Sequence, residues 1–165
     1  MKRKLIGILV AGALAGGALT GLTAHAASDP AHGHGHADTA QMLKLNDGRK
    51  WASDEPLRDG MTKIRDAVDA KLPAIRNGPQ PAQFDALARE IDTQLAGIVQ
   101  NCKLEPAADE VLHAILAEMM QGNDALRGKD PNTPRMAGIE RIVHSLGLYA
   151  GHFEHPGFEA PHAAH

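Results

Sequence analysis

Three histidines at alternating positions are the residues of this chain whose type and spacing point most directly to chemistry. His32, His34 and His36 are separated by single glycines. Imidazole nitrogen is a ligand for copper, nickel and zinc, and glycine lets the backbone bend so that three rings can converge on one cation. Ordering a flexible segment costs entropy, so we expect a modest affinity. The alternative is a solvated segment without a binding role.

A second set of potential ligands is spread through the rest of the chain: Met61, Cys102, His113, His152 and His155. If the chain folds as an up-down bundle of helices, these five residues fall near one end of it. Thioether, thiolate and imidazole groups bind copper or zinc, so that end is a candidate metal site. The alternative is a core methionine, a core cysteine and surface histidines.

Helical geometry separates these candidates, because successive residues are rotated by about 100°. Met61 and Cys102 fall within apolar stripes and are expected to point inward. His113 lies well away from its stripe, and His152 lies on the flank of its stripe. The periodicity therefore favours structural roles, whereas a site on the rim of the bundle, using Cys102 and His155 with His152 or His113, stays open.

Four apolar stripes with residues recurring at three and four positions predict the elements that would hold these side chains. We expect helices over roughly 54–76 and 81–102, a third from Pro106 to just before Gly128, and a fourth from Thr133 to just before His155. Ser53 and Thr133 are the expected N-caps of the first and last helices. The short connections predict an all-α, antiparallel up-down four-helix bundle.

The amino-terminal residues have the three parts of an export signal. Residues 2–4 are basic, residues 5–22 are apolar, and Ala24-His25-Ala26 supplies the small-x-small cleavage pattern. We therefore expect cleavage before Ala27 and a periplasmic location, with no integral membrane segment in the mature protein. The alternative is an uncleaved membrane anchor.

This interpretation divides the chain into four parts. We expect a signal peptide, a disordered His-rich arm, the helical bundle and a flexible tail, at residues 1–26, 27–41, 42–158 and 159–165 respectively. Within the third part, Asn46-Asp47-Gly48 predicts a tight turn before the first helix.

The charge and cysteine content limit the possible partners. Loss of three basic residues with the signal leaves 14 of the 17 Lys and Arg against 20 Asp and Glu, so the formal charge moves from -3 to -6. An acidic chain argues against nucleic acid as a partner. Cys102 is the only cysteine, so the chain forms no internal disulfide and has no CxxCH haem-attachment motif.

Residues suited to catalysis are not evident in the sequence. The apolar stripes contain no inward Asp or Glu, which argues against a ferritin-like di-iron oxidase. Ser145 and His144 are adjacent on a helix and so do not face each other. We therefore expect that the protein is not an enzyme.

Three segments carry a resemblance to a known family: Lys50–Met61, Asn101–Asp109 with Leu112-His113, and His152–Gly157. Over roughly residues 43–158 the chain resembles the DnrO-like family of small exported proteobacterial proteins. The resemblance implies a periplasmic helical domain and no established activity.

The arrangement also resembles, more loosely, the b-type cytochrome built as a four-helix bundle. Met61 and His152 occupy places comparable to the haem ligands of that protein. Tyr149 and Phe153, however, are expected to fill the inner face of the last helix, so we place a haem-binding electron carrier last.

The leading hypothesis is thus a periplasmic protein that binds or sequesters copper or zinc. The second is a metal-free helical interaction or stress-response module whose partner is another periplasmic protein.

Overall fold

The computed structural model of the protein describes residues 43–161, which form four α-helices. In chain order these are α2 (Glu55–Asn77), α3 (Pro81–Asn101), α4 (Pro106–Leu126) and α5 (Arg135–His152). The described residues contain no β-strand beyond two isolated bridges, which confirms the all-α class. The predicted signal peptide and His-rich arm lie outside the described residues.

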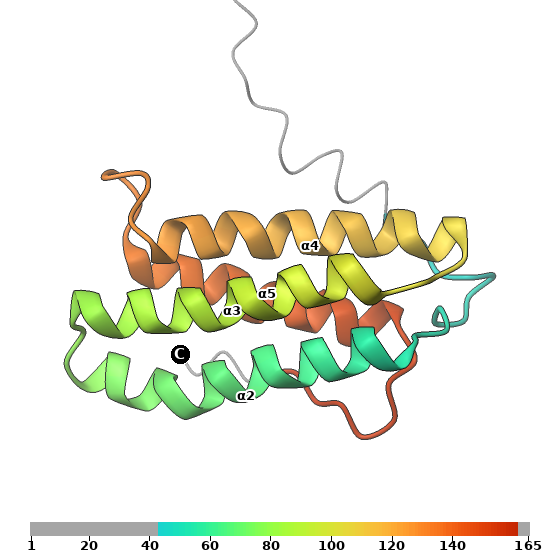
Figure 1. The fold of residues 1–165 in the computed structure, drawn as a ribbon, viewed down its shortest axis with the longest axis horizontal. Helices are drawn as coiled ribbons and strands as arrows, with labels where there is room; N and C mark the ends of the chain where they lie inside the picture. Colours follow the sequence, from blue (N-terminus) through green and yellow to red (C-terminus); the bar gives the residue numbers. More distant parts are fainter. Residues whose placement is uncertain (1–42, 162–165) are drawn as a thin grey trace, which may run out of the picture. The chain divides into compact units, whose positions relative to one another are not determined.

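The four helices lie side by side with nearly aligned axes (Figure 1). α2 packs on α3 and α5, and α4 packs on the same two helices, so each helix has two main neighbours. The connections are short, since Gly78–Gln80 joins α2 to α3 and Cys102–Glu105 joins α3 to α4. The ends of consecutive helices are therefore held close together.

The apolar stripes face one shared core, as their spacing predicts. The predicted stripe of α2 is buried at every position: Leu57, Met61, Ile64, Val68, Leu72 and Ile75. On α3 the stripe is buried from Phe84 to Ile98, but Cys102, its expected last inward residue, is only half-buried. The helix ends at Asn101, and Cys102 has an extended backbone with φ of -67° and ψ of 138°, which turns the side chain away from the helical register.

Two predicted N-caps are wrong by one residue. Asp54, not Ser53, caps α2, because its Oδ1 accepts the Leu57 N–H at 3.0 Å. The N-cap of α5 is Pro134 instead of Thr133, whose hydroxyl donates to Asp130 Oδ2 at 2.6 Å. In both cases the expected cap hydroxyl is used for a contact outside the helix.

α4 and α5 come into close backbone contact at a pair of glycines, Gly122 and Gly138. A Cβ placed on Gly138 would lie 2.5 Å from the Gly122 carbonyl oxygen and 2.7 Å from the Leu126 nitrogen. A Cβ on Gly122 would lie 2.9 Å from the Gly138 carbonyl oxygen. Only residues without a side chain fit at this contact, so the two glycines set the spacing of the two helices.

The expectation that no acidic side chain points inward is wrong at α4. Glu118 is 5% exposed, and its Oε2 lies 3.8 Å from Arg141 Nη1 of α5. A long basic side chain from a neighbouring helix makes this burial possible, because a buried charge is tolerated when it is paired. The sequence periodicity of α4 alone does not reveal this partner.

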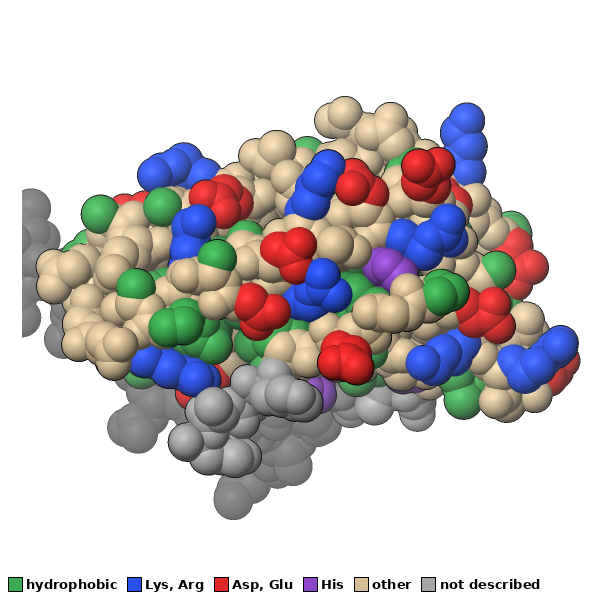
Figure 2. Space-filling model, turned by 90° about the horizontal axis from the view of Figure 1, so that it is seen from below, with side chains coloured by type: hydrophobic (Ala, Val, Ile, Leu, Met, Phe, Trp, Pro, Cys, Tyr) green, Lys and Arg blue, Asp and Glu red, His purple; other side chains and the backbone are tan. Residues whose placement is uncertain are grey.

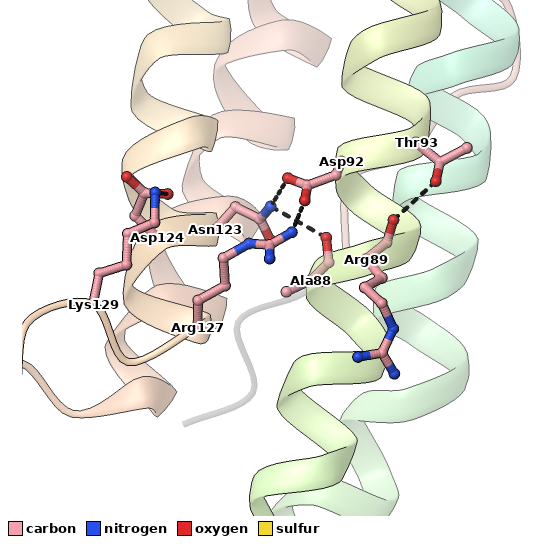
Figure 3. A network of polar contacts seen from close by, with 8 residues as sticks. All are labelled: Ala88, Arg89, Asp92, Thr93, Asn123, Asp124, Arg127 and Lys129. Atoms are coloured by element: carbon pink, nitrogen blue, oxygen red, sulfur yellow. Dashed lines mark hydrogen bonds and ion pairs between the residues drawn. The ribbon is translucent and has the colours of Figure 1, made fainter.

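A polar network links α3 to α4 (Figure 3). Asn123 is 2% exposed, and its amide nitrogen donates to the Ala88 carbonyl at 3.2 Å and to the carboxylate of Asp92. Arg127 forms an ion pair with the same carboxylate. These contacts tie α3 to α4 through side chains of both helices.

The charged surface gives no sign of a basic patch on the face shown in Figure 2, where Lys and Arg are interspersed with Asp and Glu. Such mixing is typical of a solvated helical surface. Among the helices of residues 43–161, none is both long and apolar enough to cross a membrane.

The glycine contact predicts a large effect from a small substitution. Gly138→Ala should destabilise the protein by about 1–3 kcal/mol, because the added methyl group overlaps the α4 backbone. Gly147→Ala is the matched control on α5, since nothing lies within 4 Å of a Cβ there. This control should be neutral or more stable by up to about 1 kcal/mol, because alanine favours helix. Urea unfolding measures both, and equal stability of the two variants would contradict the tight contact.

Candidate functional site

The beginning and the end of the described chain meet at one end of the helices. Trp51 N–H donates to the His152 carbonyl at 2.7 Å, and Glu154 N–H donates to the Trp51 carbonyl at 2.8 Å. We call residues 51–58 and 149–158 the terminal cluster. It contains two of the predicted ligands, His152 and His155, together with interacting polar and aromatic side chains.

Trp51 is held in the terminal cluster by its own flanking turn. Its side chain is 8% exposed, and the indole N–H donates to the Lys44 carbonyl at 2.6 Å. A tight turn brings Lys44 back, with backbone hydrogen bonds of 2.8 and 2.9 Å between Asn46 and Arg49. Gly48 has a φ of +80°, which glycine adopts without strain. The turn predicted here is confirmed.

Tyr149 lies at the centre of the terminal cluster and is fully buried, at 0% exposure. Its hydroxyl is hydrogen-bonded to His155 Nδ1 at 2.9 Å. A buried hydroxyl without a partner costs about 1–3 kcal/mol, so this bond allows the ring to stay in the core. Burial raises the pKa of Tyr149, which is therefore a neutral hydroxyl at physiological pH.

Ser53 connects three segments of the terminal cluster. Its hydroxyl donates to the Glu154 carbonyl, and the Arg58 guanidinium donates to both the carbonyl and, at 3.3 Å, the hydroxyl of Ser53. This use of the hydroxyl explains why the capping role passes to the next residue, Asp54.

Three rings, those of Phe153, His155 and Phe158, pack against the Tyr149 ring. The Tyr149 ring is stacked on Phe153 with centroids 5.6 Å apart and meets the edge of Phe158 at 5.0 Å. His155 is stacked on Phe158 at 4.8 Å, and the Arg65 guanidinium lies 5.2 Å from the centroid of the same ring. The imidazole of His155 is thus enclosed by aromatic groups on its own segment and on α5.

Asp54 joins the terminal cluster to the α3–α4 connection. Its Oδ2 accepts the Lys103 N–H at 2.6 Å, and its carboxylate also accepts hydrogen bonds from Leu57 N–H and the Cys102 thiol. Burial acts to raise the pKa of Asp54, but these hydrogen bonds and the charge of Arg58 hold it below its usual range. Asp54 is therefore a carboxylate at neutral pH.

Cys102, unlike Asp54, is held in its protonated form. Burial, followed by the negative charges of Asp54 and Asp109, raises the pKa of Cys102 to about 12. The thiolate is the form that binds metals and attacks electrophiles. At neutral pH the protein holds this residue as a thiol that donates a hydrogen bond, which is the structural role favoured by the periodicity.

The five predicted ligands of the helical domain are placed as follows. Met61 is fully buried in the core. His113 is exposed, with Nδ1 2.9 Å from the Asp109 carbonyl and 3.3 Å from its carboxylate. His152 is half-buried, and its Nδ1–H donates to the carbonyl one helical turn earlier at 2.7 Å. His155 Nδ1 is hydrogen-bonded to the Tyr149 hydroxyl, and the Cys102 thiol interacts with the Asp54 carboxylate.

The five predicted ligands therefore do not contact one another. Met61 packs in the core, and the three histidines are hydrogen-bonded to carbonyls, a carboxylate or a hydroxyl. Across residues 43–161, no group of three or more His, Cys, Asp or Glu side chains is arranged to hold a metal ion. The remaining predicted ligands, His32, His34 and His36, lie outside the described residues.

The sequence did not reveal that Asp54 lies beside Cys102 or that Asp109 pairs with His113. The second pair carried a usable signal, because Asp109 precedes His113 by four residues and so shares a helix face with it. Asp54 lies 49 positions from the Lys103 amide that it accepts, and no local pattern indicates that contact.

The raised pKa of Cys102 predicts a pH profile for its alkylation by iodoacetamide. The rate should rise about tenfold per pH unit and reach no plateau below about pH 10, because the thiolate fraction controls the reaction. Asp54→Asn removes a nearby negative charge and should speed the reaction at pH near 8, whereas the exposed control Asp59→Asn should leave it unchanged. A plateau near pH 9 in the native protein would mean an ordinary thiol and would contradict the environment described.

The chain matches no protein-family model, no curated protein and no solved structure. No relative therefore assigns a role to a residue of the terminal cluster.

Proposed function

We propose that this protein is an exported, periplasmic metal-binding protein in which His32, His34 and His36 take up copper or zinc. The observation that carries the proposal is the spacing of these imidazoles, three within five residues and separated only by glycine. Neutral imidazole suits both metals, and the intervening glycines impose no steric barrier to convergence. The function is sequestration or transfer of the ion, because ordering three glycine-separated imidazoles around it costs entropy and keeps the affinity modest.

The helical unit acts as the carrier of this segment. Its best potential ligand, Cys102, is a thiol with a pKa of about 12 and is hydrogen-bonded to Asp54. A metal at that position would have to displace this hydrogen bond and the proton before it could bind. This cost supports placing the ligands in the His-rich segment.

We further propose that the helical unit is an antiparallel up-down bundle that belongs with the DnrO-like family. The short connections between α2, α3 and α4 support the topology, because consecutive helices joined by a few residues run in opposite directions. The family resemblance rests on the segments at 50–61, 101–113 and 152–157.

The second candidate is a metal-free helical interaction module. A groove of about 340 Å³ between α2 and α3 favours it, because the groove is lined largely by alanine. The alanines are Ala70, Ala74, Ala82 and Ala86. Haem b is not part of the proposal, because Tyr149 and Phe153 are buried, with exposures of 0% and 1%.

The metal assignment predicts a clear difference between two triple variants. Replacement of His32, His34 and His36 by Asn should remove the binding of Cu(II) and Zn(II), measured by calorimetric titration of the mature protein. The matched control replaces His113, His144 and His152 by Asn, which removes the same number of imidazoles from the helical unit. This control should bind as the unaltered protein does. Loss of binding in the control with retention in the first variant would contradict the proposal.

Export predicts a defined amino terminus. Protein recovered from the periplasm should begin at Ala27, because the small-x-small pattern ends at the preceding residue. Intact-mass measurement of the recovered protein tests this directly. Recovery of the full-length chain from the membrane fraction would contradict it.

A further inference from the structure

The segment that follows α5 is anchored at Phe153 and Glu154, and residues 155–161 beyond them are held by few contacts. Figure 1 shows this segment leaving the end of α5 and running back toward α2. Phe153 is buried in the core, and the Glu154 backbone is hydrogen-bonded to the Trp51 carbonyl and to the Ser53 hydroxyl. Beyond Glu154, the contacts are those of the half-buried side chains of His155 and Phe158, with Ala160 against the core. A change at His155 therefore acts on a large part of what holds residues 155–161.

His155 is placed where a positive charge is disfavoured. Its ring lies on Phe158, and its Nδ1 is bonded to the hydroxyl of the fully buried Tyr149. Two guanidinium groups of α2, those of Arg58 and Arg65, act on it electrostatically. The Arg65 guanidinium lies 5.2 Å from the centroid of the Phe158 ring. Protonated His155 would therefore place a second positive charge beside the same ring.

The other titratable groups near this contact do not offset the two arginines. From α5, Tyr149 is a neutral hydroxyl, because burial raises its pKa. From the start of α2 and the α3–α4 connection, the Asp54 carboxylate is committed to Lys103 N–H, Leu57 N–H and the Cys102 thiol. On the segment itself, Glu154 and Glu159 are exposed to water.

We propose that the Tyr149–His155 contact is a pH-sensitive latch, which holds residues 155–161 on α2 while His155 is neutral and releases them when it is protonated. The inference is independent of metal binding, because it uses none of the three histidines of the amino-terminal segment. Release would expose the aromatic surface of Phe158 and loosen the bond between Glu154 and Trp51. The latch would thus couple the acidity of the compartment to the exposure of one end of the helices.

The direction of the pH dependence follows from the two states of His155. Burial first, and then Arg58 and Arg65, lower the pKa of His155 in the folded protein below its ordinary value of 6.5. The released segment, in which the pKa is ordinary, therefore binds more protons between the two values. The contribution of His155 to holding the segment on α2 is therefore complete above pH 6.5. It is lost as the pH falls through the lowered pKa of His155.

Trp51 provides a built-in probe, because it is the only tryptophan and its backbone is bonded to Glu154. On going from about pH 7.5 to about pH 5, the range in which histidine titrates, its emission should shift to longer wavelength while the far-ultraviolet circular dichroism stays helical. Over the same range, exchange of the Glu154 amide hydrogen, corrected for intrinsic rate, should increase. Both measurements use the full mature chain.

Two variants separate the latch from general acid effects. His155→Asn keeps an acceptor near the Tyr149 hydroxyl but cannot be protonated, so the pH response should disappear. His144→Asn removes an exposed imidazole from α5 and should respond as the unaltered protein does. An unchanged response in His155→Asn, or no response in the unaltered protein, would overturn the proposal.

Direct titration keeps the test decisive if His155→Asn fails to fold. The ring signals of His155 in the unaltered protein, followed by NMR, should give a pKa below 6.5. Signals of Phe158 should change with the same midpoint. A pKa at or above the ordinary value, or a Phe158 signal independent of it, would overturn the latch.

Discussion

The need to satisfy the buried hydroxyl of Tyr149 is the constraint on which the end of this fold depends. The ring completes the core of α5, but its oxygen cannot be left without a hydrogen bond in an apolar interior. His155 supplies that bond at 2.9 Å from the segment that follows α5. Trp51 pairs with residues 152–154 in the same region, so the segments that flank the helices meet beside this tyrosine. One buried polar atom thus organises the region that contains two of the potential ligands, His152 and His155.

The sequence predicted the helices because their signals are local. Apolar residues recur at three and four positions, and Pro81 and Pro106 stand at helix starts, where a missing N–H costs nothing. The core positions of α2 are confirmed for the same reason. Such signals need no knowledge of the neighbouring helix.

What the sequence did not predict depends on contacts between distant residues. The hydroxyl of Ser53 is used by Glu154, 101 positions away, so the helix cap moves to Asp54. Glu118 is buried because Arg141 comes from another helix. Cys102 continues the periodicity of α3, but the helix ends before it. In each case tertiary contacts override a local preference, and a single sequence contains no record of those contacts.

The proposed separation between a metal-binding segment and a helical carrier is tested most directly by residue-resolved NMR of the mature protein titrated with Zn(II). The account predicts that the ring signals of His32, His34 and His36 shift first, while the signals of residues 43–161 stay in place. Early shifts at Cys102, His113 or His155, with the amino-terminal histidines unaffected, would contradict it and place the site in the helical unit.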